Sequence, residues 1–161
     1  MKRIRSKYTH PEFQFARFRL ASNDFGIDIK NVKEIIRHRE IVKSASFPPF
    51  LEGFIRLRSM AVPVIDLRKR FSLEQSFNDS TRVIIASVQR HIAGLIVDEV
   101  TDITMGGKEL MVEPGTLSGK WGGSIDAVIE TGRGTVMIMN PALLLTDTEK
   151  SSLDDPLKLP E

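Results

Sequence analysis

The sequence predicts a mostly β fold built from two similar units, and three observations lead to this prediction. Most apolar residues lie in short runs that Gly, Pro, Asn and Asp residues separate. Residues 26–35 align with residues 94–103, with glycine, valine and isoleucine at matching positions. Residues 64–66 align with residues 138–140, and a short apolar run follows each. Two copies of one β-rich unit explain these matches, and chance similarity between apolar segments is the alternative.

The first unit is expected to open with a β-hairpin followed by a short helix. Residues 16–20 alternate between apolar and arginine side chains, which is typical of a strand with one buried face. Asn23-Asp24 is expected to turn this strand into a second one. Asp28 can cap a helix, and apolar residues recur at helical spacing over 29–36. We therefore expect a helix there, with its charged face in solvent.

Residues 53–71, G-F-I-R-L-R-S-M-A-V-P-V-I-D-L-R-K-R-F, close the first unit. Two apolar runs flank a short basic turn, and Asp66 is placed to cap a helical turn. Proline cannot donate a hydrogen bond to a neighbouring strand, so Pro63 predicts that its strand lies at the edge of a sheet. An apolar edge strand beside several arginines predicts a docking surface.

The second unit is expected to consist of strands that are apolar on both faces. A polar stretch over 73–81 links it to the first unit. Strands inside a closed barrel, or between two barrels, show this two-sided apolar pattern. The four expected strands span residues 83–88, 91–97, 125–129 and 136–139.

The predicted domain organisation is a single folded domain over residues 13–146. Its first barrel unit is expected at about 13–74 and its second at about 80–146. Each unit is small for an independent core, so the two should share an interface. Residues 1–12 are expected to form a flexible basic tail and residues 147–161 a flexible C-terminal tail.

Composition and motifs argue against catalysis, cofactors and metal ions. With 41% hydrophobic and 27% charged residues, the chain has the composition of a globular protein. It has no cysteine, and its 3 histidines are far apart in the sequence. Residues 115–121, G-T-L-S-G-K-W, lack the spacing and the final Ser or Thr of a phosphate-binding loop. We therefore expect no enzymatic activity, no cofactor and no bound metal.

Nucleic acid and membrane insertion are also disfavoured. The net charge is only +2, and the chain has 1 Trp and 1 Tyr with which to stack bases. A small β-barrel that binds RNA or DNA is nevertheless one alternative. No apolar stretch is long enough to span a bilayer. The simplest location is the cytoplasm.

Three motifs in order resemble one known family. They are F-G-I-D-I-K-N-V-K-E-I, then P-P-F-L-E-G-F-I-R-L-R-S-M-A-V-P-V-I-D-L-R, then A-G-L-I-V-D-E-V. From about residue 15 to 145 the sequence closely resembles the CheW-type chemotaxis coupling proteins. The resemblance implies the CheW-like fold, which is two intertwined SH3-like five-stranded β-barrels with short helices. It also implies a non-enzymatic adaptor that joins transmembrane chemoreceptors to the regulatory domain of a CheA-type histidine kinase in membrane-associated arrays.

The resemblance implies two contact surfaces. The receptor-binding positions would be Val32, Leu57, Arg58, Gly94 and Leu95, and the kinase-binding positions would be Glu34, Ala61, Val62, Pro63 and Val64. Without the resemblance, the apolar members of both sets are typical core residues.

One turn departs from the family pattern. The family's N-L-R-G is R-L-R-S here, at residues 56–59, so Arg58 is kept while the asparagine and glycine are replaced. Glycine permits a backbone angle that serine disfavours. This departure supports an alternative function, in which the coupling module serves a non-flagellar chemosensory pathway such as surface motility or gene regulation.

Overall fold

The structure is a computed structural model that describes residues 7–10, 12–43, 45–112, 119, 121 and 123–154. The basic run at the start of the expected N-terminal tail lies outside the described residues. So do most of the glycine-containing segment 115–121 and the last part of the expected C-terminal tail, residues 155–161. Within the described ranges, no helix is both long and apolar enough to cross a bilayer.

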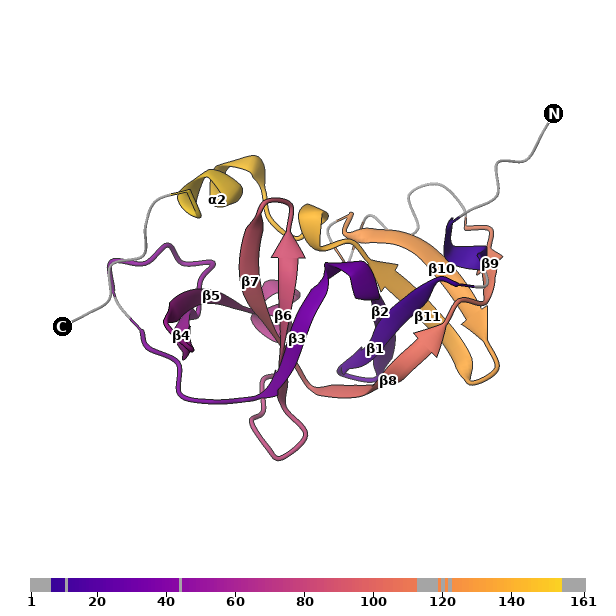
Figure 1. Cartoon of the computed structure of the whole chain (residues 1–161), viewed down its shortest axis with the longest axis horizontal. Helices are drawn as coiled ribbons and strands as arrows, with labels where there is room; N and C mark the ends of the chain where they lie inside the picture. The colour runs from indigo at the N-terminus through magenta and orange to yellow at the C-terminus, as the bar shows by residue number, and fades with distance from the viewer. Residues whose placement is uncertain are drawn as a thin grey trace.

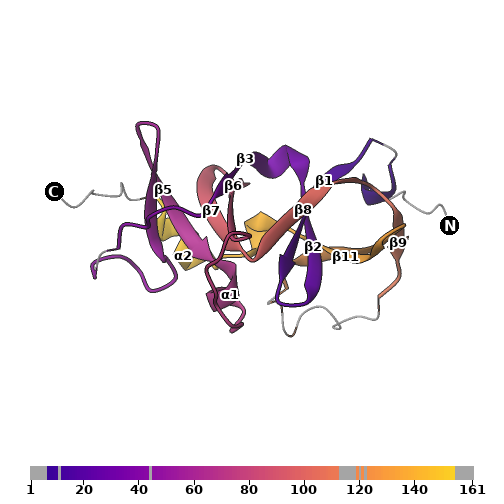
Figure 2. The same ribbon diagram turned by 90° about the horizontal axis from the view of Figure 1, so that it is seen from below.

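Two curled sheets lie side by side and make up most of the molecule (Figure 1, Figure 2). Sheet A has six strands in the order β8-β1-β2-β11-β10-β9, and sheet B has five in the order β3-β6-β7-β5-β4. The predicted mostly β class is thereby confirmed. Sheet A consists of β1 (Gln14–Leu20), β2 (Asn23–Asp28), β8 (Glu99–Met105), β9 (Lys108–Leu110), β10 (Ile125–Thr131) and β11 (Gly134–Met139). Sheet B consists of β3 (Val32–Arg37), β4 (Gly53–Leu57), β5 (Met60–Asp66), β6 (Arg82–Val88) and β7 (His91–Val97).

Each half of the sequence contributes strands to both sheets. β3 leaves β2 through the 3-10 turn η2 (Ile29–Asn31) and pairs with β6 in sheet B, while β8 leaves β7 and pairs with β1 in sheet A. The expected units 13–74 and 80–146 therefore mark two halves of the sequence, not two separate barrels. The exchange arises because β3 and β8 follow equivalent strands of the repeat and each crosses to the other sheet.

The internal repeat is confirmed by equivalent pairings in the two sheets. Gly26 of β2 pairs in parallel with Ile138 of β11, and Gly94 of β7 pairs in parallel with Val64 of β5. A capped turn follows β5 and β11, the strands that pair with these two glycine-containing strands. Asp66 caps α1 (Leu67–Arg70), and Asn140 caps the 3-10 turn η3 (Pro141–Leu143) through its own side chain.

The helix expected over 29–36 is wrong beyond its first turn. The Asp28 side chain accepts a hydrogen bond from the Lys30 amide at 3.0 Å, but the turn ends at Asn31 and strand β3 begins. β-branched residues favour strands when they can pack on both sides. When β3 pairs with β6, its two faces pack against different apolar clusters. Ile35 packs against the core shared by the sheets, and Ile36 lies inside sheet B.

Three apolar clusters form the core. The largest lies between the two sheets, where Phe18 stacks on Phe25 at 5.6 Å and Trp121 meets Phe25 edge-on at 4.8 Å. A second cluster fills sheet B and a third fills sheet A. The shared cluster draws on both sheets, as expected for units too small to bury a core alone.

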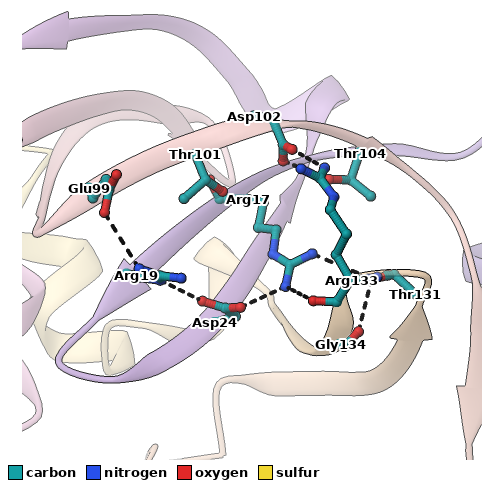
Figure 3. A network of polar contacts seen from close by, with 10 residues as sticks. All are labelled: Arg17, Arg19, Asp24, Glu99, Thr101, Asp102, Thr104, Thr131, Arg133 and Gly134. Carbon is teal, nitrogen blue, oxygen red and sulfur yellow. Dashed lines mark hydrogen bonds and ion pairs between the residues drawn. The ribbon is translucent and has the colours of Figure 1, made fainter.

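Arg17 departs from the alternation expected in β1, because it is buried with only 5% of its surface exposed. β1 lies between β2 and β8, so both of its edges are paired, and Arg17 meets polar groups of β2 and of the β10–β11 turn. The Arg17 guanidinium donates to an Asp24 carboxylate oxygen at 2.6 Å and to the Arg133 carbonyl at 2.8 Å (Figure 3). Arg133 in turn pairs with Asp102 of β8. This network joins the β10–β11 turn to β1, β2 and β8.

The C-terminal tail expected from residue 147 is instead a docked helix up to Asp154. Thr146 and Glu149 form a capping box at the start of α2 (Asp147–Ser152). Glu149 also accepts two hydrogen bonds from the Arg70 guanidinium, both at 2.7 Å. Asp154 pairs with Arg90 and His91, each at 3.0 Å. These contacts attach α2 to α1, and the residues after α2 to the β6–β7 hairpin of sheet B. Thr-x-x-Glu was the sequence signal for the start of α2.

Acidification is expected to release α2. Hydrogen bonds from Arg70 hold the pKa of Glu149 below its usual range. A lowered carboxyl pKa contributes stability above the ordinary value of about 4.3, and this contribution is lost as pH falls through the lower folded-state pKa. Glu149→Gln should lower the free energy of unfolding by about 1 kcal/mol at neutral pH, as measured by urea unfolding. The variant should also lose less stability than the wild-type protein when the pH is lowered. The control is Asp147→Asn at a fully exposed side chain. If Glu149→Gln loses as much stability at acidic pH as the wild-type protein does, the prediction is wrong.

Candidate functional site

The hairpin of β4 and β5 turns at Arg58 and Ser59. Leu57 pairs with Met60 at its end, so the turn has two residues. Arg58 has φ +56°, whereas Ser59 is not among the residues with positive φ. The left-handed conformation expected at Ser59 therefore falls on Arg58. Serine at position 59 therefore does not strain this turn. Arg58 is the residue in the left-handed conformation, which costs a non-glycine residue conformational energy.

The strand that contains Pro63 is not the outermost strand, which corrects the prediction made from the proline. β5 lies between β4 and β7 in sheet B. However, its ladder to β7 covers only Val64 to Asp66 and begins directly after Pro63. Proline has no amide hydrogen to continue that ladder. Residues 60–63 therefore pair with β4 alone and keep one open edge.

Side chains alternate along this open segment. Val62 and Val64 point into sheet B and are 2% and 0% exposed. Ala61 and Pro63 are half-buried, and Met60 is 54% exposed. The exposed arginines of the hairpin complete what we call the hairpin surface, which consists of Arg56, Arg58, Met60, Ala61 and Pro63.

An ion pair connects the hairpin turn to β3. Arg58 donates to the two carboxylate oxygens of Glu34 at 3.1 and 3.4 Å. β3 and β4 are the opposite edges of sheet B, so the pair spans the ends of the curled sheet. Arg58 was predicted at the receptor surface and Glu34 at the kinase surface. The structure brings these two positions into direct contact.

The other predicted receptor-binding residues are largely covered. Leu95 is 0% exposed in the shared core, and Leu57 is buried inside sheet B. Gly94 lies within β7, where an added Cβ would come 2.8 Å from a Val83 methyl group. Val32 is half-buried against the shared core. Arg58 is the exposed member of this set, and the covered residues can act on a partner only by shaping the sheets.

Comparison with known proteins places this geometry in a family. Residues 14–149 match the family model of the CheW-like domain. The chain belongs to the CheW family. Chemotaxis protein CheW of Bacillus subtilis is 30% identical over 141 residues, which cover 86% of this chain and 90% of that protein. Chemotaxis protein CheW of Klebsiella aerogenes is 35% identical over 91 residues, and this match spans about half of each protein, 56% of this chain and 55% of the relative.

A solved structure agrees with the family assignment. The crystal structure of scaffolding protein TtCheW from Thermoanaerobacter tengcongensis matches with a TM-score of 0.71 and 28% sequence identity. The match covers 82% of this chain and 91% of that chain. These relatives confirm the CheW-like fold and the prediction of a non-enzymatic chemotaxis coupling adaptor.

Sequence reasoning missed a buried ion-pair network in this CheW-like domain, which Arg68 forms with Asp66 and Asp98 where β5 ends. The Arg68 guanidinium is fully buried and pairs with Asp66 at 2.7 Å and with Asp98 at 2.9 Å. It also donates to the Ser76 carbonyl at 2.7 Å, and its carbon lies 4.8 Å from the centre of the Phe77 ring. Asp98 accepts a further hydrogen bond from the amide of Ala21, which follows β1. Arg68 therefore links β5, the 73–81 connection and sheet A.

Proposed function

We propose that this protein couples chemoreceptors to the regulatory domain of a CheA-type histidine kinase, and that the hairpin surface is a principal contact. The observation that supports this most directly is the open edge of residues 60–63. No strand of the described residues pairs with this edge, which lies beside exposed Met60 and half-buried Pro63. Such an edge can accept a partner's backbone or apolar side chains. Membership of the CheW family supports the choice of partners.

The Arg58–Glu34 pair allows the two proposed surfaces to influence each other. A receptor that draws Arg58 away would release Glu34 on β3, and a kinase that binds Glu34 would release Arg58. The pair is surface-exposed, with 73% of the Arg58 side chain and 32% of the Glu34 side chain accessible. An exposed pair contributes little to stability, so a partner can replace it at small cost.

The folded unit that carries this function would extend from residue 13 to the end of the docked helix at Asp154. The expected boundary at 146 leaves out the Arg70–Glu149 and Arg90–Asp154 contacts. We place the protein at the cytoplasmic side of receptor arrays, where both partners would be accessible to it.

Binding measurements with two charge variants test the proposal. Purified protein is titrated separately with a CheA-type regulatory domain and with a chemoreceptor cytoplasmic fragment, by calorimetry. Pro63→Asp should weaken kinase binding, and Arg58→Glu should weaken receptor binding, each by about tenfold or more, as for central residues of a modest interface. Lys108→Glu on β9 is the control for Arg58→Glu, because it makes the same charge change at an exposed residue of the other sheet.

A charge swap separates the ion pair from direct contact. Arg58→Glu combined with Glu34→Arg restores an opposite-charge pair across sheet B. Recovery of binding would assign the effect to the pair, whereas continued loss would assign it to direct contact by Arg58. Wild-type affinity in both Pro63→Asp and Arg58→Glu, with circular dichroism unchanged, would remove the hairpin surface from the proposal.

A further inference from the structure

Positive charges without an acidic partner gather around β3. Most described lysines and arginines form an ion pair within the described chain. Those that form none include exposed residues on η2, on β3, on the segment after it and on β4, and half-buried Arg82 on β6, while Lys108 lies apart on β9. The group around β3 consists of Lys30, Lys33, Arg37, Arg39, Arg56 and Arg82.

Two of these arginines face each other directly. Arg37 and Arg82 are cross-strand partners on β3 and β6, so their side chains lie on the same face of sheet B. Like charges in this position destabilise a sheet. Arg82 is also held in place, since its guanidinium donates to the carbonyls of Asp79 at 2.6 Å and Thr81 at 2.9 Å. The fold thus keeps two arginine side chains next to each other at a cost, and it orients one of them.

An exposed aromatic ring lies on the loop to which Arg82 donates its hydrogen bonds. Phe77 is 49% exposed, and its ring centre lies 4.5 Å from that of His38, which stands between Arg37 and Arg39 in the sequence. The loop that carries the ring is ordered, because Thr81 Oγ1 accepts a hydrogen bond from the Asn78 amide at 3.0 Å. The neighbouring acidic residues Glu40 and Asp79 form no ion pair within the described residues. The Arg39 guanidinium instead reaches β4, where it donates to the Arg56 carbonyl at 3.4 Å. We call Arg37, Arg82 and Phe77 the arginine cluster.

We propose that the arginine cluster is a third docking site, which binds an acidic polypeptide segment that also carries apolar side chains. Guanidinium groups bind carboxylates through paired hydrogen bonds, and the exposed part of Phe77 offers apolar contact next to them. A protein segment fits better than nucleic acid because the ring already contacts Arg68 and His38, which leaves less of its face for base stacking. Alternation along β3 places Arg37 on the face opposite Glu34, so this site is separate from the Arg58–Glu34 pair.

One substitution separates binding from stability. Arg37→Glu would replace a repulsive cross-strand pair with an attractive one, so the variant should melt at a higher temperature than the wild-type protein. The same variant should bind the fluorescein-labelled peptide Glu-Glu-Leu-Glu-Glu-Leu-Glu-Glu-Leu at least tenfold more weakly in fluorescence anisotropy at low salt. Lys108→Glu, with an equal change in net charge, should bind it within about twofold of wild type.

The probes also decide the class of ligand. The peptide in which every Glu is replaced by Gln should not bind. A single-stranded oligonucleotide and vesicles containing phosphatidylglycerol should bind more weakly than the acidic peptide, with no greater loss in Arg37→Glu than in Lys108→Glu. Equal peptide affinity in Arg37→Glu and Lys108→Glu would overturn the site. Tighter, Arg37-dependent binding of the oligonucleotide or the vesicles would overturn the polypeptide assignment.

Discussion

Replacing Arg68 with methionine is expected to lower the free energy of unfolding by about 3–5 kcal/mol. The Arg68 and Asp66 side chains are both 0% exposed, so the variant leaves a carboxylate buried without its counter-charge. It also removes the donor to Asp98 and to the Ser76 carbonyl, which loosens the connection between the sheets. Urea unfolding followed by the fluorescence of Trp121 in the shared core measures the loss.

A second variant and a neighbouring control make this prediction specific. Arg68→Met combined with Asp66→Asn removes both charges but keeps a side-chain oxygen to cap α1, so it should recover at least about half of the lost stability. Lys69→Ala, next to Arg68 but 55% exposed, should cost less than about 1 kcal/mol. If Arg68→Met costs no more than Lys69→Ala, the buried network is not what holds this region together.

The strands were predictable because their signals are local. Apolar runs identified β6, β7, β10 and β11, and the repeat identified equivalent segments, which form equivalent pairings in the two sheets. β3 was not predictable, because Ile29, Val32 and Ile36 lie at helical spacing, and within so short a segment this pattern does not exclude a strand. Its partner β6 decides the outcome, and that pairing lies far along the chain. The exchange of β3 and β8 between the sheets could not be predicted from local sequence for the same reason.

The candidate site was predictable where it depends on the turn, and not where it depends on burial. The R-L-R-S segment located the hairpin, and Pro63 located the point where the ladder to β7 begins. Apart from the resemblance, Leu95 was expected in the core, where it lies, but that Arg17 and Arg68 are buried charges depends on elements that cover them from distant parts of the sequence. Asp66 and Arg68 stand two residues apart, yet their partner Asp98 cannot be found from local spacing.

Substitutions at Gly94 are expected to damage sheet B before they affect any partner contact. A Cβ at this position would lie 2.8 Å from a methyl group of Val83 and 3.4 Å from one of Val64, inside the closed sheet. Gly94→Ala should therefore cost about 1–3 kcal/mol through overpacking. Gly94→Asp should cost more, because it also places an unpaired carboxylate among apolar neighbours. Urea unfolding of both variants gives these values directly.

The comparison that matters is between loss of stability and loss of binding. Gly132→Ala is the matched control, since its added Cβ would meet nothing within 4 Å, and it should leave both quantities close to wild type. If Gly94 acts through packing, receptor affinity measured well below the melting temperature should fall only as far as the folded fraction falls. A Gly94→Ala variant with wild-type stability and weakened receptor binding would show that Gly94 is a contact residue. Because the glycine is enclosed by Val64 and Val83, we expect the first result, and with it a receptor surface centred on exposed Arg58.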